Sequence, residues 1–302
     1  MEDFELLLED RLHTIREVNK KYDLENNAYV AFSGGKDSTV LHHLIDMALP
    51  NNKIPRVYMN TGIDYQFIYQ FVNKLKDDDN RIIIVNPTQN IKQMLETFGY
   101  PFKSKTHSHF LSTYRISGMT DSVKQYAQNW EKDNFYKCPK KLQYQFTEDF
   151  KIPVSDRCCL KLKKEPAHKW QIENNKSISI TGMRKDEGGA RAKGSCIVTQ
   201  SDGTISKFHP LFVVSDEFVD WFVDKFNIEL CKLYYPPYNF KRTGCKGCPF
   251  NRRLDEELEM LETYLPNERK HCELIWKPIY DEYRRIGFRL NVKYKQNKKT
   301  RN

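Results

Sequence analysis

The chain has 302 residues, of which 39% are hydrophobic and 29% are charged, the composition of an ordinary folded, water-soluble protein. It has no uninterrupted apolar run of the roughly 18 residues that a membrane helix needs, so no membrane partner is expected. Its acidic beginning lacks the basic region of a secretory signal. Eight cysteines without an export signal favour a cytoplasmic location, where cysteines serve packing, metal binding or catalysis.

The net charge of +9 comes largely from three basic segments. They lie at 138–146, at 157–170 and in the tail 291–302, whose charges are all cationic. Such segments are either solvated surface or binding faces for a nucleotide or a nucleic acid, and charge alone leaves both interpretations open. The tail is expected to be disordered.

Hydrophobic periodicity predicts alternating helices and strands in the first third of the chain. The predicted elements follow in chain order: helix 4–23, strand 27–32, helix 38–49, strand 56–60, helix 66–77, strand 81–87 and helix 88–99, the last with Thr88 as its cap and Gly99 at its end. This alternation predicts an α/β fold with a doubly wound, mostly parallel sheet. Right-handed crossovers place the C-terminal ends of the strands along one edge, where ligands bind.

The rest of the chain is less regular at first, because 101–154 is rich in aromatic and basic residues without a clear period. The pattern then predicts a core strand at 177–184, a hairpin at 196–212 with its turn at 201–203, a helix that begins at Ser215, and helices at 254–265 and 267–288. We therefore expect one large domain at 1–250, a cysteine-containing helical extension at 251–290, and the tail.

The segment SGGKDS joins a predicted strand to a predicted helix. It comprises Ser33, Gly34, Gly35, Lys36, Asp37 and Ser38. A helix N-terminus carries partial positive charge and open N–H groups, glycines allow close backbone approach, and a lysine and hydroxyls add donors, so the segment suits a phosphate or pyrophosphate. The spacing is not that of a Walker A loop, and the aspartate could help to hold Mg²⁺. The alternative is a tight turn with a solvated lysine.

This segment resembles the PP-loop of the ATP-pyrophosphatase superfamily, whose fold is Rossmann-like. The segment NTGIDY, which follows the second predicted strand, resembles the part of that superfamily that meets adenine and ribose. The resemblance implies that Asn60, Thr61 and Gly62 line a nucleoside pocket and that Asp64 lies near it.

Further motifs resemble the phosphoadenosine-phosphosulfate reductase family in the order that the family uses. They are DRCCLKLK, ITGMRKDEGGAR, KFHPLF and TGCKGCPF, and the likeness spans about 5–250. It implies that Arg184, Lys185 and Arg191 bind the phosphate or sulfate end of an adenine nucleotide, as forked guanidinium donors can. Lys36, Asp37 and Arg184 are then the expected catalytic residues. The alternative is that the arginines lie on the surface and pair with the neighbouring acidic residues at 186 and 187.

Four cysteines in two of these motifs could bind a metal: Cys158, Cys159, Cys245 and Cys248. Four thiolates suit zinc or an iron–sulfur cluster. In adenylyl-sulfate reductases, which this arrangement resembles, it holds a 4Fe-4S cluster, so we favour that cluster over Zn²⁺. Buried free thiols are the third interpretation. Cys138 could replace one ligand, whereas Cys196 and Cys231 lie in apolar segments and are expected in the core.

The sequence departs from the reductases in one respect. Their nucleophilic cysteine lies in a C-terminal tail, whereas the tail of this chain has no cysteine and Cys272 lies in a predicted helix. We therefore expect ATP cleavage between the α and β phosphates with adenylation of an acceptor for sulfur transfer. The acceptor could be a nucleic acid, as in related phosphorothioation proteins, and a sulfur-donor protein could take part. The alternatives are a sulfonucleotide reductase that makes sulfite and a non-catalytic nucleotide sensor. The oligomeric state stays open.

Overall fold

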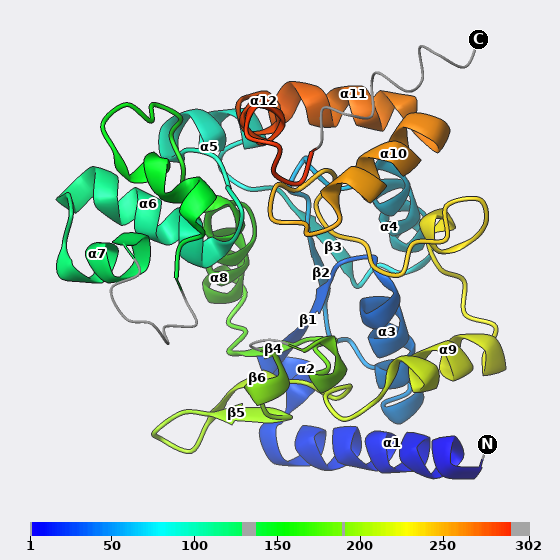
Figure 1. Ribbon diagram of the computed structural model, residues 1–302. Coiled ribbons are helices and arrows are strands. Elements are labelled where there is room, and N and C mark those ends of the chain that lie inside the picture. Colours follow the sequence, from blue (N-terminus) through cyan, green and yellow to red (C-terminus); the bar gives the residue numbers. More distant parts are fainter. Residues whose placement is uncertain (1, 129–136, 189–190, 291–302) are drawn as a thin grey trace. The chain divides into compact units, whose positions relative to one another are not determined.

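The computed structural model describes residues 2–128, 137–188 and 191–290, so the tail that we expect to be disordered lies outside the described residues. The chain forms two compact units, each built from two separate segments (Figure 1). Unit 1 comprises Met1–Thr88 and Glu165–Thr243, and unit 2 comprises Gln89–Lys164 and Gly244–Asn302. The domain boundaries expected near residues 250 and 290 remain a prediction.

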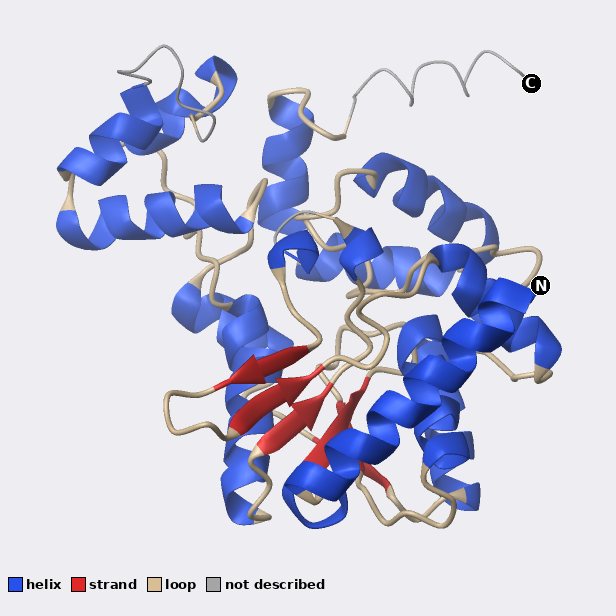
Figure 2. Cartoon of the chain, turned by 90° about the horizontal axis from the view of Figure 1, so that it is seen from below, coloured by secondary structure: helices blue, strands red, loops and turns tan. Residues whose placement is uncertain are grey.

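A six-stranded sheet with the order β3-β2-β1-β4-β6-β5 forms the centre of unit 1 (Figures 1 and 2). Neighbouring strands are parallel except for β5 and β6, which form the predicted hairpin. The strands are β1 Ala28–Phe32, β2 Arg56–Met59, β3 Ile82–Val85, β4 Ile178–Ile180, β5 Ile197–Thr199 and β6 Ile205–Phe208. The predicted doubly wound, mostly parallel α/β sheet is thus confirmed.

The direction of winding reverses beside β1. The chain runs outward from β1 to β2 and β3, and later returns to add β4 and β6 on the other side of β1. Loops that leave β1 and β4 therefore diverge at the same edge of the sheet. Such a topological switch point is where open α/β sheets bind ligands, and the SGGKDS segment follows β1 there.

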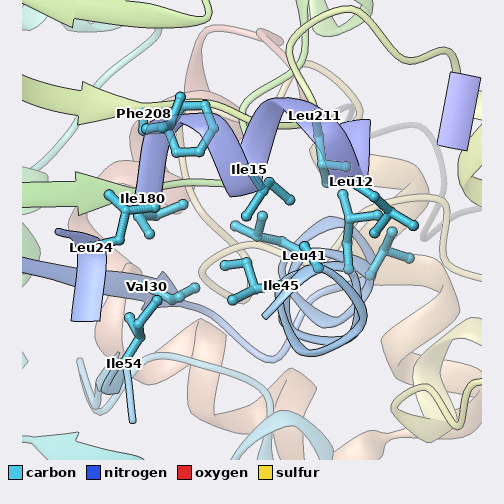
Figure 3. Close-up of a cluster of buried hydrophobic side chains, with 14 of the residues drawn as sticks. Leu12, Ile15, Leu24, Val30, Leu41, Ile45, Ile54, Ile180, Phe208 and Leu211 are labelled. Carbon is cyan, nitrogen blue, oxygen red and sulfur yellow. The ribbon is translucent and has the colours of Figure 1, made fainter. Parts of the chain in front are cut away.

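One face of this sheet packs against helices of unit 1. The helices of the unit are α1 Glu2–Tyr22, α2 Leu24–Asn27, α3 Lys36–Ala48, α4 Gln66–Asp78, α8 Glu165–Glu173 and α9 Asp216–Lys225. Apolar side chains of α1, α3 and α9 meet those of β1, β4 and β6 in a core drawn in part in Figure 3: Leu12, Ile15, Leu41, Ile45, Val30, Ile180 and Phe208. Burial of each such side chain stabilises the fold by about 2 kcal/mol. This core fixes the helix that begins in the SGGKDS segment.

Unit 2 is helical in its described part. It contains α5 Ile91–Phe98, α6 Lys105–Ser117, α7 Asp121–Gln128, α10 Leu254–Tyr264, α11 Pro266–Ile275 and α12 Lys277–Arg285, with a 3₁₀ helix at Lys140–Phe146 and a π-helical turn at Leu160–Lys164. Among all the helices described here, none has the length and apolar character needed to cross a bilayer.

Two helix predictions were wrong in detail. The cap of α5 is Asn90, not Thr88, because Asn90 and Gln93 exchange side-chain and backbone hydrogen bonds at 2.9 and 3.1 Å in a capping box. The helix expected at 267–288 breaks at Trp276 into α11 and α12. Pro278 explains the break, since proline lacks an N–H and fits only the first turn of a helix.

Candidate functional site

The SGGKDS segment forms a tight loop between β1 and α3. Gly34 has φ +68°, a left-handed conformation, and a Cβ there would lie 2.9 Å from Val72 Cγ2 and 3.1 Å from Ile68 Cγ2. Glycine is therefore required both by the backbone and by the close approach of α4. Gly182, which follows β4, is constrained by close approach alone, because its Cβ would lie 3.0 Å from the carbonyl oxygen of Asp37.

Hydrogen bonds of the hydroxyl groups stabilise the conformation of the loop. Ser38 donates to the carbonyl of Gly35 at 2.9 Å, Ser33 N donates to Ser38 Oγ at 3.2 Å, and Thr39 donates to the carbonyl of Gly35 at 3.1 Å. The hydroxyls that we expected to face a phosphate are thus engaged within the loop. They serve to pre-organise the backbone rather than to offer free donors.

Backbone amides at the start of α3 remain open. The amide of Lys36 donates to the hydroxyl of Tyr234 at 2.9 Å, and that hydroxyl lies 2.8 Å from Thr243 Oγ1. The amides of Gly34, Asp37 and Ser38 make no hydrogen bond within the described residues. No side chain caps this 13-residue helix. Open amides at the positive end of a helix dipole form an anion site.

The ammonium group of Lys36 lies 2.5 Å from Asp220 Oδ1, on α9. The carboxylate of Asp220 is 61% exposed, so the pair contributes about 1 kcal/mol or less. The lysine can therefore exchange this partner for a phosphate at small cost.

Arg184 is almost fully buried beside the loop. Its Nε donates to Asp37 Oδ1 at 2.9 Å, its Nη2 donates to Asp216, and its Nη1 has no hydrogen-bond partner among the described residues. Burial lowers the pKa of Arg184, but the ion pairs with Asp216 and Asp37 outweigh burial and raise the pKa above its usual value. Burial raises the pKa of Asp37, and the guanidinium of Arg184 opposes that rise only in part. A fixed arginine thus holds the first-turn aspartate of α3.

A cavity of about 820 Å³ opens at this edge of unit 1. The loop forms one wall through Ser33, Gly35, Lys36, Asp37 and Ser38. Its cations outnumber its carboxylates: the cations are Lys36, Arg191, Lys193, Lys207, Lys241 and Arg242, and the carboxylates are Asp37 and Glu187. The excess of positive charge favours an anionic ligand.

Glu187 organises part of this charge. Its side chain is only 4% exposed and accepts hydrogen bonds from Arg191 and Arg242. The pairing of Arg191 with Glu187 matches the alternative interpretation of that arginine, whereas Arg184 pairs with Asp37 and Asp216 instead. Lys185 begins a 3₁₀ turn and is exposed, and it does not line the cavity.

The residues expected at the nucleoside lie at the end of β2. The side-chain amide of Asn60 donates to Asn86 Oδ1 at 2.9 Å, and the hydroxyl of Thr61 donates to Asp64 at 2.7 Å. Gly62 has φ +72° with open space around it. These residues do not line the cavity described above, which extends from β1 toward β4, β6 and β5. Their role at a nucleoside stays a prediction.

The four predicted metal ligands all belong to unit 2 and lie near one another. Burial raises the pKa of Cys158, and the charges of Cys245, Cys159 and Cys248 add to the rise. Burial likewise raises the pKa of Cys248 to about 12, with Cys245 and Cys159 contributing again. The fold therefore brings together thiols from two distant segments of the sequence.

The donor chemistry of these thiols suits a metal, but their arrangement is not that of a metal site. Within the ranges that the structure describes, no group of three or more His, Cys, Asp or Glu side chains is placed to hold a metal ion. None of the eight cysteines is in a disulfide. The 4Fe-4S cluster and its zinc alternative stay predictions, and we assign no reaction step to either.

The remaining cysteines occupy different surroundings. Cys138 is buried beside His107, with Sγ 4.0 Å from Nδ1. Cys231 is buried, and Cys196 packs partly buried against the core of unit 1. Cys272 lies in α11 with 0% exposure, and burial raises the pKa of its thiol to about 12.

Several residues of the site were not found from the sequence. Tyr234 and Thr243 close over the amide of Lys36, Asp216 completes the partners of Arg184, and His209 lines the cavity. Tyr234 and Thr243 come from an irregular aromatic and basic segment, so no periodic signal marked them. His209 stood within the KFHPLF motif, where a polar residue directly after a strand is the signal that could have identified it.

The fold is that of an α/β protein with a glycine-containing loop at the switch point of its sheet. The model of the phosphoadenosine phosphosulfate reductase domain family matches residues 27–131 and 118–251. The chain belongs to this family, which confirms the resemblance seen in the motifs. No curated protein matches the chain.

Solved structures similar to this chain include three at low sequence identity. Phosphoadenylyl-sulfate (PAPS) reductase from Candida auris is 16% identical, with 76% of this chain and 87% of that chain covered and a TM-score of 0.46. FMN adenylyltransferase from Candida glabrata is 12% identical, with coverage of 76% and 60% and a TM-score of 0.43. The U34-tRNA thiolase NcsA from Methanococcus maripaludis, solved with its [4Fe-4S] cluster, is 13% identical, with coverage of 94% and 80% and a TM-score of 0.42.

Proposed function

We propose that the chain binds ATP with its phosphates at the loop 33–38 and cleaves it between the α and β phosphates. An acceptor oxygen forms a bond to the α phosphorus, the bond from that phosphorus to the bridging oxygen breaks, and pyrophosphate leaves. The observation that carries this proposal is the set of open amides of Gly34, Asp37 and Ser38 at the beginning of α3, located at the switch point of the sheet.

Three side chains have separate roles in this proposal. Lys36 leaves Asp220 and neutralises the charge that develops on pyrophosphate. Arg184 is the buried positioning residue that holds Asp37 in the first turn of α3, and its open Nη1 is a donor for a phosphate oxygen. Arg191, half exposed at the cavity, can exchange Glu187 for the nucleotide because Arg242 keeps Glu187 paired.

The proposed cofactors follow from the same residues. Mg²⁺ supplies charge neutralisation on the phosphates when bound, and Asp37 is the carboxylate in the loop that could contact it. One oxygen of Asp37 already accepts from Arg184, so the metal would be held mainly by the nucleotide. Cys158, Cys159, Cys245 and Cys248 are the proposed ligands of a 4Fe-4S cluster, supported by the approach of the four thiols.

Membership of the reductase family favours a second candidate, reduction of a sulfonucleotide to sulfite. That reaction needs an accessible thiolate to attack sulfur. Cys272 is fully buried with its pKa raised to about 12, which is the opposite environment. We therefore rank adenylation first, with a nucleic acid or a small molecule as acceptor and a sulfur-donor protein as partner.

Product analysis tests the proposal. The purified full chain is incubated anaerobically with Mg²⁺ and, in parallel, with ATP, adenylyl sulfate or its 3′-phosphorylated form, the last two with thioredoxin. We expect pyrophosphate and AMP from ATP, and no sulfite from either sulfonucleotide. Sulfite without pyrophosphate would replace adenylation by reduction, and tight nucleotide binding without any product would identify a sensor.

A further inference from the structure

The cavity of unit 1 has a polar floor that the loop does not explain. We use "polar floor" for Ser179, Thr181, Lys207 and His209, which all line the cavity. Ser179 and Lys207 are direct partners in the register of β4 and β6. Thr181 and His209 follow two residues later on the same face, with the amide of Thr181 donating to the carbonyl of Phe208 at 3.0 Å.

Such a face is unusual for inner strands. Strands inside a parallel sheet are normally apolar on both faces, because helices cover both. The opposite face of β4 and β6 obeys this rule through Ile178, Ile180, Ile205 and Phe208, which are buried in the core with α1, α3 and α9. On the polar face, Trp170 of α8 packs against Tyr29 of β1 and Val57 of β2. The part of this face formed by β4 and β6 lines the cavity instead.

His209 is held in place within this floor. It is 3% exposed, and Thr181 Oγ1 lies 2.7 Å from its Nδ1. The hydrogen bonds of its ring among the described residues all go to Thr181. Burial lowers the pKa of His209, and the charge of Lys207 adds to that effect. When Nδ1 accepts from the hydroxyl of Thr181, the imidazole carries its proton on Nε2, which can then donate to a ligand.

The cations that line the cavity are only partly paired with carboxylates. Lys36, Arg191 and Arg242 have carboxylate partners. Lys193, Lys207 and Lys241 line the same cavity and form no salt bridge within the described part of the chain. All three lysines are exposed, and an excess of positive charge along a cavity is complementary to an oxyanion.

We propose that the polar floor binds the oxyanion group of the acceptor substrate, a carboxylate, sulfate or phosphate, with Lys207 and His209 Nε2 as donors. The acceptor assignment rests on the proposed function, because the loop between β1 and α3 then holds the nucleotide phosphates. The nucleoside residues expected at the end of β2 lie on one side of β1, and the polar floor lies on the other. The α phosphorus at the loop would thus stand between nucleoside and acceptor.

Anion titration of the full chain tests the floor without requiring turnover. Protein labelled with ¹⁵N-histidine is titrated separately with sodium sulfate, phosphate and acetate, and the imidazole resonance of His209 is assigned through His209→Gln. We expect a saturable shift of that resonance with at least one anion. Lys207→Met should weaken this binding about tenfold, the effect of one lost charged hydrogen bond. Lys20→Met, an exposed lysine on α1, is the matched control and should leave the titration unchanged.

Further arms separate this inference from the proposed function. Lys36→Met should leave the His209 titration intact, because the loop is a different anion site. Saturating ATP should leave anion binding at His209 intact if the floor belongs to the acceptor. Displacement by ATP, an unresponsive His209 resonance, or equal behaviour of Lys207→Met and Lys20→Met would overturn the inference. A chain that binds no ATP but keeps the Lys207-dependent shift would refute the proposed function and leave the oxyanion site standing.

Discussion

The SGGKDS loop of unit 1 and the cysteine group of unit 2 differ in how the chain builds them. The loop is one continuous segment, in which residues 33–35 join β1 to α3 and residues 36–38 begin α3, and it is held by hydrogen bonds within itself. The cysteines come from two segments that the fold must bring together, and they approach without the arrangement of a metal site in the described structure. Local hydrogen bonding is therefore enough to shape the loop, whereas the position of the four thiols depends on how distant segments of the chain pack.

The cysteine group offers the largest expected effect, because metal retention is all or none. Protein purified anaerobically should absorb near ~400 nm, as expected of thiolate-bound iron–sulfur clusters. Cys248→Ser should abolish the absorbance and the iron content, whereas Cys231→Ser, a buried thiol of unit 1, should retain both. Iron analysis of the three proteins is the measurement, and colourless protein with stoichiometric zinc would favour the zinc alternative.

A substitution in the loop should change the activity more than the free energy of unfolding. Lys36→Ala should slow pyrophosphate release from ATP by about 100-fold, since one charge that stabilises a leaving group is lost. The free energy of unfolding should change by less than about 0.5 kcal/mol, because the pair with Asp220 is exposed. Lys74→Ala, which breaks an exposed pair with Glu229, serves as control. Wild-type rates in Lys36→Ala would remove the loop from the reaction.

Arg184 and Arg191, from one motif, should contribute unequally to the stability of unit 1. Arg184→Met should lower the free energy of unfolding by about 2–3 kcal/mol, because it leaves the half-buried Asp37 without its partner. Arg191→Met should cost less than about 1 kcal/mol, since Arg242 still pairs with Glu187. Urea unfolding of both variants decides the point, and equal losses would contradict the burial argument.

The contribution of the ion pairs of Asp46 to stability can be tested through its pH dependence. Asp46, on the same helix as the loop, is partly buried, which raises its pKa, but Arg81 and Arg56 outweigh burial and lower the pKa to about 2. An acid with a lowered pKa stabilises the fold above its unfolded pKa, near 4, and loses that contribution as the pH falls toward 2. Asp46→Asn should therefore cost about 2 kcal/mol at pH 7, with the difference from wild type shrinking below pH 4.

Urea unfolding at pH 7 and at a series of pH values between 4 and 2 measures that difference. The dissociation constant for ATP should stay unchanged at pH 7, because Asp46 lies far along α3 from the loop. A pH-independent cost would show that the ion pairs with Arg56 and Arg81 are not its source.

Cys272→Ala gives the smallest expected effect. Under the adenylation proposal, pyrophosphate release should change by less than about twofold, since a buried thiol with a pKa near 12 is not a nucleophile at neutral pH. The wild-type thiol should also react slowly with a thiol reagent in the folded state. Loss of turnover in Cys272→Ala would instead support the sulfonucleotide reductase.

The sequence was most informative where structure follows from local pattern. The parallel sheet, the hairpin, the cap Ser215 and the position of the loop were all predicted correctly, because periodicity and turn chemistry are local. The partners of Lys36, Arg184 and Arg191 were not predictable in the same way. Tyr234, Asp216 and Arg242 reach them from distant segments, so only the folded chain defines the charge balance of the cavity.

If the loop binds phosphates as we propose, the hydrogen bond from the amide of Lys36 to the hydroxyl of Tyr234 affects which ligands it accepts. Any phosphate that takes this amide must first compete with a tethered group that is always present at high effective concentration. A lone inorganic phosphate has few other contacts with which to win that competition, whereas a nucleotide has several. Under the proposed function, this tyrosine would therefore make the loop bind a nucleotide in preference to inorganic phosphate.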